Sequence, residues 1–360
     1  MKAIAATPGV RDSLAPIEAA DPRPGDRDVL VEVVRVGVCG TDSEIREGRY
    51  GKAPPASDYL IIGHEALGRV AEVGTLVRDV SVGDQVVASV RRPCPHEHCQ
   101  PCRNSANDFC TTGDYTERGI VSAHGFLAQY YVENQELLTV IPAALEELGV
   151  LLEPMSVVEK AVRHIFAVQE RIQWEAETAL VLGAGAIGLL ATVLLRLRDI
   201  DTYVVDRSEA GGFKSQLISR LGARHLSTGA APISDVTSEI GGVDVVLEAT
   251  GFAPLVFEAV PLLKPNGIVA MLGISGDGGE TPVRAGQFNN SMVLGNRLMF
   301  GSVNAGMVDF RSGVEHLHQA QRRWPGVLEK LITRRVPFDA FQDAFDRRPD
   351  DIKVVIEVTS

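Results

Sequence analysis

The chain changes its hydrophobic pattern near residue 155. Before this point, short apolar stretches at residues 29–36, 67–73 and 84–89 are separated by glycine and proline residues. Short runs of this kind, punctuated by turn-forming residues, are typical of β-strands. The first part of the sequence therefore predicts a β-rich domain.

The second part of the chain alternates mainly apolar strands with helices. We predict strands at residues 178–182, 202–205, 242–247 and 267–272, with helices at 187–197 and 252–263. Continuous apolar strands that alternate with helices favour a doubly wound parallel sheet with helices on both faces. From about residue 299 the chain leaves this pattern, and residues 353–358 predict one more strand. The fold class is thus α/β, with one domain at 1–156 and 299–360 and a second at 157–298.

Composition and charge narrow the classes of function. The 360 residues carry a net charge of −12, which argues against a nucleic-acid partner or an anionic membrane surface. No apolar run approaches the ~20 residues that a membrane-spanning helix needs, and the N-terminus does not read as a signal peptide. We therefore expect a soluble protein of the reducing cytoplasm.

A glycine motif predicts a dinucleotide site. Gly183, Gly185 and Gly188 form G-x-G-x-x-G after a predicted strand and at the start of a predicted helix. The glycines allow a tight turn and a close approach of the backbone to a pyrophosphate, which then faces the helix N-terminus. Ala186 and Ile187, inside the motif, belong to the same predicted contact. The context makes the motif far more specific than the pattern alone.

The next predicted strand ends in Asp206, 18 residues after Gly188. Its carboxylate can accept hydrogen bonds from the ribose hydroxyls and would repel a 2′-phosphate, which favours NAD. Arg207 would instead favour NADP, because a guanidinium can bind that phosphate. We predict NAD as the preferred cofactor, with some use of NADP.

Cys39 and His64 are candidates for a metal site in the first domain. Each lies next to a glycine, in Cys39-Gly40-Thr41-Asp42 and Gly63-His64-Glu65. A thiolate and an imidazole are ligands that a catalytic zinc favours, with a carboxylate as a third ligand. By themselves, a single cysteine and a single histidine are more often ordinary core residues.

The segment Gly63-His64-Glu65-Ala66-Leu67-Gly68, followed by Val73-Gly74 and Val82-Gly83-Asp84, resembles the signature of the zinc-containing medium-chain dehydrogenases. The resemblance covers essentially the whole chain and implies a GroES-like domain joined to a Rossmann domain. It implies that Cys39, His64 and Glu153 are zinc ligands, that Glu65 is a supporting carboxylate or alternate ligand, and that Thr41 contacts the substrate hydroxyl and starts a proton relay. We also assign cofactor contacts to Thr250, Gly273, Ile274, Ser302, Val303 and Asn304.

A cluster of cysteines resembles the structural zinc lobe of the same family. Cys99, Cys102 and Cys110 fit its last three positions, but Cys94 lies five residues before Cys99, where the family pattern has three. His96 stands in the expected register. We favour Cys94 as the fourth ligand, because a thiolate binds zinc more strongly than an imidazole beside three thiolates, and keep His96 as the alternative.

Several segments resemble the glucose dehydrogenases of this superfamily, among them Val90-Arg91-Arg92-Pro93, 116–126, 153–161 and Gly301-Ser302-Val303-Asn304. The resemblance implies oxidation of an aldose to its lactone, with Glu117, Glu153 and Asn304 in contact with sugar, cofactor or metal. Val157 departs from that branch, which often has an acidic sugar contact there. The alternative is the same chemistry on a polyol, an aminocyclitol or another secondary alcohol.

Two further questions stay open at the level of sequence. A dinucleotide-binding regulator without catalysis is disfavoured, because such a protein would be expected to lose the metal ligands.

Related enzymes are commonly homodimers or homotetramers that pair through the edge of the nucleotide-domain sheet. Residues 291–300 could form such an edge or belong to the core.

Overall fold

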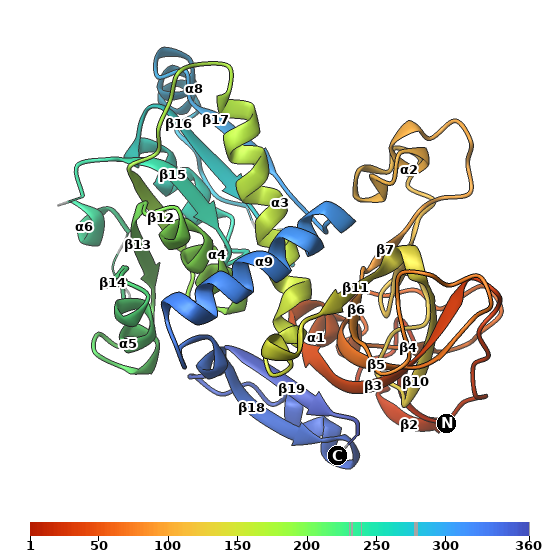
Figure 1. Cartoon of the computed structure of the whole chain (residues 1–360). Coiled ribbons are helices and arrows are strands. Elements are labelled where there is room, and N and C mark those ends of the chain that lie inside the picture. Colours follow the sequence, from red (N-terminus) through yellow and green to blue (C-terminus); the bar gives the residue numbers. More distant parts are fainter. Residues whose placement is uncertain (230, 232, 239, 277–279, 360) are drawn as a thin grey trace. The chain divides into compact units, whose positions relative to one another are not determined.

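The computed structural model describes residues 1–229, 231, 233–238, 240–276 and 280–359. The chain forms two compact units, which are coloured along the sequence in Figure 1. Unit 1 comprises Met1–Ser156, Asn304–His318 and Glu329–Ser360, and unit 2 comprises Val157–Val303 and Gln319–Leu328. Within the described ranges, no helix is long and apolar enough to cross a membrane.

Unit 1 is built on a large, mainly antiparallel sheet with the order β11-β6-β5-β3-β19-β18, in which β10 also pairs with β3. Its strands are β3 (Asp28–Val38), β5 (Glu65–Val73), β6 (Gln85–Ala88), β10 (Tyr130–Asn134), β11 (Leu138–Ile141), β18 (Ile332–Pro337) and β19 (Lys353–Glu357). Alternate residues of β3, such as Val29, Val31 and Val33, are fully buried in the core of this unit, as expected of a strand with one face packed. The C-terminal strand β19 lies antiparallel to β3 and thereby completes the sheet of the N-terminal part.

Two small sheets accompany the large one. They are formed by β2 (Ala15–Glu18), β1 (Lys2–Ala6) and β4 (Leu60–Ile61), and by β7 (Arg91–Arg92), β8 (Thr116–Arg118) and β9 (Ser122–Ala123). The helical segments of this unit are α1 (Gly40–Arg46), α2 (Gln100–Arg103), η1 (Asn107–Phe109), η2 (Gln135–Leu137), η3 (Ala143–Leu145), η4 (Gly149–Leu151) and η7 (Phe338–Phe345), with most of η6 (Leu328–Leu331).

Unit 2 contains a parallel sheet with the strand order β14-β13-β12-β15-β16-β17. The strands are β12 (Thr178–Leu182), β13 (Asp201–Asp206), β14 (Arg224–Ser227), β15 (Val243–Glu248), β16 (Leu263–Met271) and β17 (Leu298–Gly301). Every neighbouring pair is parallel. Numbered from the first strand of the unit, the order is 3-2-1-4-5-6, the arrangement of a dinucleotide-binding Rossmann domain.

Helices connect the strands of unit 2. They are α4 (Ala186–Leu197), α5 (Phe213–Arg220), α6 (Ile233–Thr237), α7 (Pro254–Ala259), η5 (Val260–Leu262) and α8 (Ala285–Leu294). Two longer helices, α3 (Leu152–Gln169) and α9 (Met307–Arg323), each contribute residues to both units. The α4 face that packs on β12 and β13 is apolar, with Leu189, Leu190 and Val193 fully buried.

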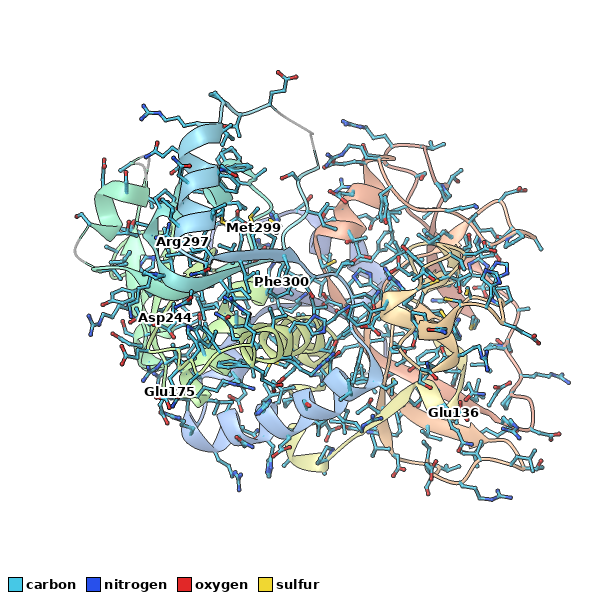
Figure 2. All side chains as sticks on the ribbon, turned by 90° about the horizontal axis from the view of Figure 1, so that it is seen from above. Glu136, Glu175, Asp244, Arg297, Met299 and Phe300 are labelled. Carbon is cyan, nitrogen blue, oxygen red and sulfur yellow. The ribbon has the colours of Figure 1, made fainter. Side chains whose placement is uncertain are left out.

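Two charged side chains labelled in Figure 2, Asp244 and Arg297, connect the N-terminal ends of the unit 2 strands. Asp244 at the start of β15 accepts hydrogen bonds from the backbone N–H of Thr178 (2.9 Å) and from the ammonium of Lys264 (3.0 Å). Arg297, directly before β17, donates to the carbonyl of Leu263. These contacts fix the register of β12, β15, β16 and β17 at the ends that face away from the glycine turn.

The structure differs from the sequence prediction at three places. The predicted helix at 252–263 is shorter, because α7 ends at Ala259 and the chain passes through η5 into β16. Residues 299–303 belong to unit 2, since β17 pairs with β16, and residues 319–328 join them through α9. The apolar stretch 291–300 is an edge strand only in part, because it comprises the end of α8 and the start of β17, which lies at the edge of the unit 2 sheet.

Candidate functional site

Cys39 and His64 meet in unit 1, although they come from separate segments. Cys39 caps the N-terminus of α1, where its Sγ accepts from the backbone N–H of Thr41 (3.3 Å). Asp42 completes this capping box by accepting from the N–H of Cys39 (3.0 Å). Nε2 of His64 lies 3.1 Å from the Cys39 Sγ, and its Nδ1 lies 3.5 Å from the buried carboxylate of Asp42. A carboxylate on one ring nitrogen orients the other nitrogen as a metal ligand.

Glu65 is the third member of this group. Its carboxylate lies within 4.8 Å of the ligand atoms of Cys39 and His64. It also accepts a hydrogen bond from the buried ammonium of Lys353, with Oε1 at 2.7 Å. Gly37 leaves the space for it, since a Cβ there would lie 2.2 Å from Oε2 of Glu65. Together these contacts hold Glu65 in a fixed, buried position beside the cysteine and the histidine.

Glu153, at the start of α3, is also buried in unit 1. It lies outside the group whose ligand atoms are all within 4.8 Å of one another. Burial, reinforced by the negative charge of Glu65, raises the pKa of the Glu153 carboxyl to about 7. A positive ion among these groups would relieve that repulsion. The thiolate, imidazole and carboxylate donors therefore fit a catalytic zinc.

The four lobe cysteines form a second cluster with the chemistry of a closed zinc site. The Sγ atoms of Cys94, Cys99, Cys102 and Cys110 all lie within 4.8 Å of one another. Hydrogen bonds led by the backbone of Thr111 lower the pKa of the Cys99 thiol to about 5. The distances among the four Sγ atoms place Cys94, and not His96, with the other three thiols. His96 instead contacts Asp114, with Nε2 2.7 Å from a carboxylate oxygen.

Glu117 and Asn304 are brought together although they lie 187 residues apart. The Asn304 amide donates to Oε1 of Glu117 (2.9 Å), and Asn304 has a positive φ of 61°. The turn that follows Glu117 packs on the segment before His64, because a Cβ on Gly119 would lie 2.4 Å from the carbonyl oxygen of Gly63. The position of Glu117 is therefore tied to the position of His64.

The glycine motif forms a tight turn between β12 and α4 in unit 2. Gly183 has a φ of 105°, which favours glycine. A Cβ on Gly188 would lie 1.9 Å from the carbonyl oxygen of Gly183, so only glycine fits there. Gly185 is the N-cap of α4, and no atom lies within 4 Å of its would-be Cβ. The open space at Gly185, above a helix N-terminus that begins with Ala186 and Ile187, suits a phosphate group.

The ends of β15 and β16 lie beside this turn. A Cβ on Gly183 would touch the Thr250 side chain at 3.0 Å, and a Cβ on Gly273 would lie 2.1 Å from the N–H nitrogen of Gly251. Glu248, buried at the end of β15, accepts from the N–H of Thr250 (2.6 Å) and holds this loop. Ile274 is 71% exposed. Thr250, Gly273 and Ile274 thus gather at the point where the strand order of the sheet reverses.

Ser302 and Val303 follow β17 on the same side of the sheet. The N–H of Ser302 donates to the carbonyl of Met271 (2.9 Å), and the carbonyl of Val303 accepts from Lys160 (3.0 Å). Among the described residues, the buried Ser302 hydroxyl has no hydrogen-bond partner.

Asp206 ends β13 and is held by two neighbours. Its Oδ1 accepts from the hydroxyl of Ser208 (2.6 Å) and lies 2.7 Å from Nε2 of His225 on β14. Burial alone would raise the pKa of the Asp206 carboxyl, but these bonds to His225 and Ser208 lower it. Asp206 is therefore ionised, and Oδ2 takes part in neither contact. Arg207 is exposed.

Several residues that shape these sites were not among those predicted from the sequence. Asp42 lies in Cys39-Gly40-Thr41-Asp42, and its position three residues after a helix cap was the signal that could have revealed it. Lys353 gave no local signal, because 288 residues separate it from Glu65. His225 and Glu248 were also missed, since neither belongs to a motif.

Two family models match the chain. The model described as the alcohol dehydrogenase GroES-like domain matches residues 25–143. The model described as the glucose dehydrogenase C-terminus matches residues 146–358. Together they extend over both units, and the second covers more than half of the sequence.

Relatives of known function are similar over the full length. The chain is 41% identical to a glucose 1-dehydrogenase of Methanocella arvoryzae over 358 residues, which is 99% of each chain. It is 41% identical to a glucose 1-dehydrogenase of Thermoproteus tenax, again over 99% of both. A solved structure of Haloferax mediterranei glucose dehydrogenase in complex with NADP, Zn and gluconolactone superposes with a TM-score of 0.92 at 35% identity, over 100% of each chain. From its GroES-like and Rossmann units, its cysteine and histidine clusters and these relatives, the chain belongs to the glucose dehydrogenase branch of the zinc-containing medium-chain dehydrogenases.

Proposed function

We propose that the protein is a dehydrogenase that oxidises an aldose such as D-glucose to its lactone and transfers hydride to NAD(P)⁺ with the help of zinc. The observation that carries the proposal is the contact between the half-buried Cys39 and the buried His64, whose Sγ and Nε2 atoms lie 3.1 Å apart, in the unit that also holds Glu117 and Asn304. The full-length similarity to glucose 1-dehydrogenases supports the choice of sugar.

We assign Cys39, His64 and Glu153 as the residues that hold the catalytic zinc, with Glu65 as the supporting or alternate carboxylate. A zinc ion bound there acts as a Lewis acid that lowers the pKa of a substrate hydroxyl. Asp42 orients His64, and Lys353 holds Glu65 in place. Cys94, Cys99, Cys102 and Cys110 hold a second, structural zinc in this proposal.

The residues around the zinc site handle the sugar. Thr41, half-buried at the start of α1, receives the proton of the hydroxyl that is oxidised and passes it outward. Glu117 and Asn304 offer polar groups to the remaining hydroxyls. A site of this kind discriminates among alcohols, because a substrate without a matching hydroxyl leaves a buried polar group unpaired. A nicotinamide dinucleotide bound to unit 2 would supply the acceptor for the hydride of the carbon that bears the oxidised hydroxyl.

The dinucleotide binds to unit 2 through the glycine turn of Gly183, Gly185 and Gly188. We propose that both NAD and NADP are used, with NAD preferred. Asp206 can accept from the adenosine ribose through Oδ2, whereas its contact with His225 reduces the field that opposes a 2′-phosphate. The exposed Arg207 is available to meet that phosphate.

A substrate panel tests the proposal. We expect reduction of NAD and NADP with D-glucose and related aldoses, with much lower kcat/KM for polyols, aminocyclitols and simple secondary alcohols. The product with D-glucose should be the lactone, identified by NMR before it hydrolyses. Turnover of polyols without any lactone from aldoses would favour the alternative substrate class.

We further propose a homodimer or homotetramer that pairs through β17, the edge strand of the unit 2 sheet. Val293 and Leu294, at the end of α8 before this strand, are 65% and 82% exposed, and Figure 2 labels Met299 and Phe300 on the strand itself. Light scattering coupled to size exclusion tests this assembly. The proposed location is the cytoplasm, where thiols remain reduced and can bind metal.

A further inference from the structure

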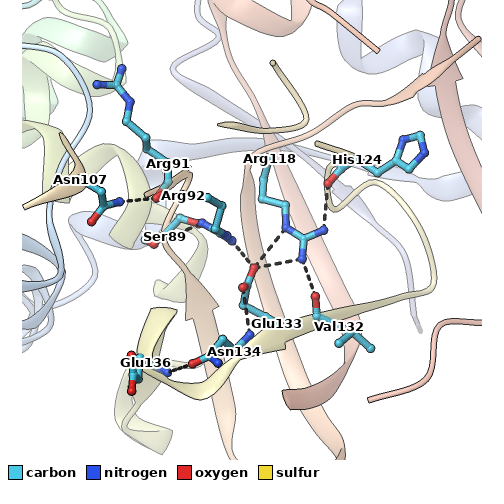
Figure 3. Close-up of polar contacts among 10 residues, drawn as sticks. All are labelled: Ser89, Arg91, Arg92, Asn107, Arg118, His124, Val132, Glu133, Asn134 and Glu136. Atoms are coloured by element: carbon cyan, nitrogen blue, oxygen red, sulfur yellow. Dashed lines mark hydrogen bonds and ion pairs between the residues drawn. The ribbon is translucent and has the colours of Figure 1, made fainter. Parts of the chain in front are cut away.

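The two-residue strand β7 carries two adjacent arginines with different partners. Arg92 and Arg118 converge on the buried carboxylate of Glu133, whereas the side chain of Arg91 points away from that group (Figure 3). Arg91 instead pairs with Glu117, which lies opposite it in the β7–β8 ladder. Alternation along a strand thus separates two buried ion pairs that are next to each other in sequence.

The three nitrogens and one face of the Arg91 guanidinium are in contact with the protein. Nε and Nη2 donate to Oε1 of Glu117 at 3.0 and 2.9 Å. Nη1 donates to the carbonyl of Asp108 (3.2 Å), and Cζ lies 3.8 Å from the centroid of the Tyr115 ring. Arg91 is only 6% exposed. A guanidinium that stacks on a ring and donates two hydrogen bonds to one carboxylate is held in a single orientation.

This orientation fixes the Glu117 carboxylate. Oε1 accepts three hydrogen bonds, two from Arg91 and one from the Asn304 amide, and Oε2 takes none of them. The other end of the Asn304 side chain accepts from the N–H of Ala305 (2.8 Å). Glu117 and Asn304 are therefore immobilised as a pair, and Oε2 is left as a carboxylate acceptor of defined direction.

The backbone of Arg91 is connected to the cysteine lobe. The carbonyl of Arg91 accepts from the Asn107 amide, and Asn107 and Asp108 belong to η1, which ends directly before Cys110. The Asp108 side chain also packs against Gly306, where a Cβ would lie 3.0 Å from Oδ1. The lobe, Arg91 and the Glu117–Asn304 pair thus form one continuous chain of contacts in unit 1.

We propose that Arg91 is a positioning residue for the sugar. Through its contacts, the position of the cysteine lobe determines where Glu117 and Asn304 lie. This inference rests on the proposed sugar oxidation. It gives the lobe a role in substrate affinity, because a shift of η1 moves Arg91 and with it the carboxylate that receives the sugar hydroxyl. Arg91 itself touches neither the reacting carbon nor the metal ligands in this account.

Arg91→Lys tests the inference, with Arg92→Lys as its matched control. Lysine keeps the charge but loses the planar fork. We expect Arg91→Lys to raise KM for D-glucose and the Kd of gluconolactone by about tenfold or more, as misplaced substrate-positioning groups do. It should leave kcat near the wild-type value and dinucleotide affinity unchanged. Arg92→Lys should lower the urea midpoint to a similar extent and leave the sugar KM unchanged.

Asn107→Ala provides a milder variant in case Arg91→Lys does not fold. It removes only the bond from η1 to the Arg91 carbonyl. We expect a smaller rise in the sugar KM, and no further rise when Asn107→Ala is combined with Arg91→Lys. A merely structural role would instead give additive losses of stability with no change in KM.

The outcomes separate this inference from the proposed function. If the wild-type protein oxidises aldoses and both Arg91→Lys and Asn107→Ala keep the wild-type KM and gluconolactone Kd, the positioning role is wrong. An equal change in KM for Arg92→Lys would also overturn it, because the effect would then follow from general loss of packing. If the wild-type protein does not oxidise aldoses, the proposed function itself fails.

Discussion

The two units of the molecule build their sites in different ways. In unit 2, the glycine turn, the start of α4 and Asp206 all lie between residues 183 and 206, and parallel strands bring their ends to the same edge. In unit 1, the contacts that matter join distant segments, such as Glu65 with Lys353 and Glu117 with Asn304, which are 288 and 187 residues apart.

This difference has an energetic consequence. A site made of a local turn depends mainly on backbone geometry, so that a single added methyl group can distort it. A site made of distant buried charges depends on each charge keeping its partner, because a buried ion without compensation is costly. Variants in unit 1 and unit 2 should therefore fail in distinguishable ways.

The largest effect is expected at the residues of unit 1 that we propose as zinc ligands. Cys39→Ser should lower kcat by about a thousandfold or more, because the Lewis acid contributes several kcal/mol to the transition state. Dinucleotide affinity, a property of unit 2, should stay unchanged in fluorescence titration. Equal losses of turnover and dinucleotide binding would show that the two sites are not separable.

Lys353→Met is expected to have the next largest effect, on stability. It leaves the buried Glu65 carboxylate without its ammonium partner, and we expect the free energy of unfolding to fall by about 3 kcal/mol. The double variant Glu65→Gln with Lys353→Met should recover most of this loss in urea denaturation. If Lys353→Met were as stable as the wild type, the ion pair between Glu65 and Lys353 would not have this stabilising role.

The glycine turn of unit 2 offers a matched pair of variants. Gly188→Ala should cost about 1–3 kcal/mol of stability, since its Cβ would lie 1.9 Å from the Gly183 carbonyl oxygen and the turn must shift. Gly185→Ala should leave stability unchanged, because no protein atom lies within 4 Å of that Cβ and its φ is −85°. It should nevertheless weaken dinucleotide binding in titration calorimetry, if a phosphate approaches this backbone. Unchanged binding in Gly185→Ala would mean that no ligand lies against the turn.

The smallest effect is expected at His225. Removing the imidazole from Asp206 Oδ1 strengthens the negative field of that carboxylate. We expect His225→Ala to lower the ratio of kcat/KM for NADP over NAD by about threefold to tenfold, the range of one hydrogen bond. The ratio is measured on a single sample and so does not depend on the folded fraction. A ratio that rises would contradict the assigned role of His225.

The same contrast explains how far the sequence alone could reach. The strand at Thr178–Leu182, the glycine turn and Asp206 were predictable, because the Rossmann signals are adjacent in sequence and are governed by local backbone rules. The return of the C-terminal strand to the first domain was also expected, and the structure shows that this strand, β19, pairs with β3. The end of β17 was misassigned, since an edge strand carries no signal of the sheet it joins.

In unit 1, the sequence indicated residue types but not their partners. Cys39 and His64 were chosen through a family resemblance, and only the fold places them 3.1 Å apart. Glu117 and Asn304 were expected to contact sugar, cofactor or metal, but the sequence did not reveal that they are hydrogen-bonded to each other or that Glu117 is also bonded to Arg91. Long-range ion pairs such as Glu65 with Lys353 leave no periodicity, so no pattern in a single sequence could reveal them.

The most direct test of the central claim is to measure lactone formation and bound zinc on the same sample, before and after removal of the metal. We expect that D-glucose yields lactone with NAD or NADP reduction, that chelation abolishes this turnover while dinucleotide binding to unit 2 persists, and that added zinc restores turnover. Lactone formation at an undiminished rate in zinc-free protein would contradict the account.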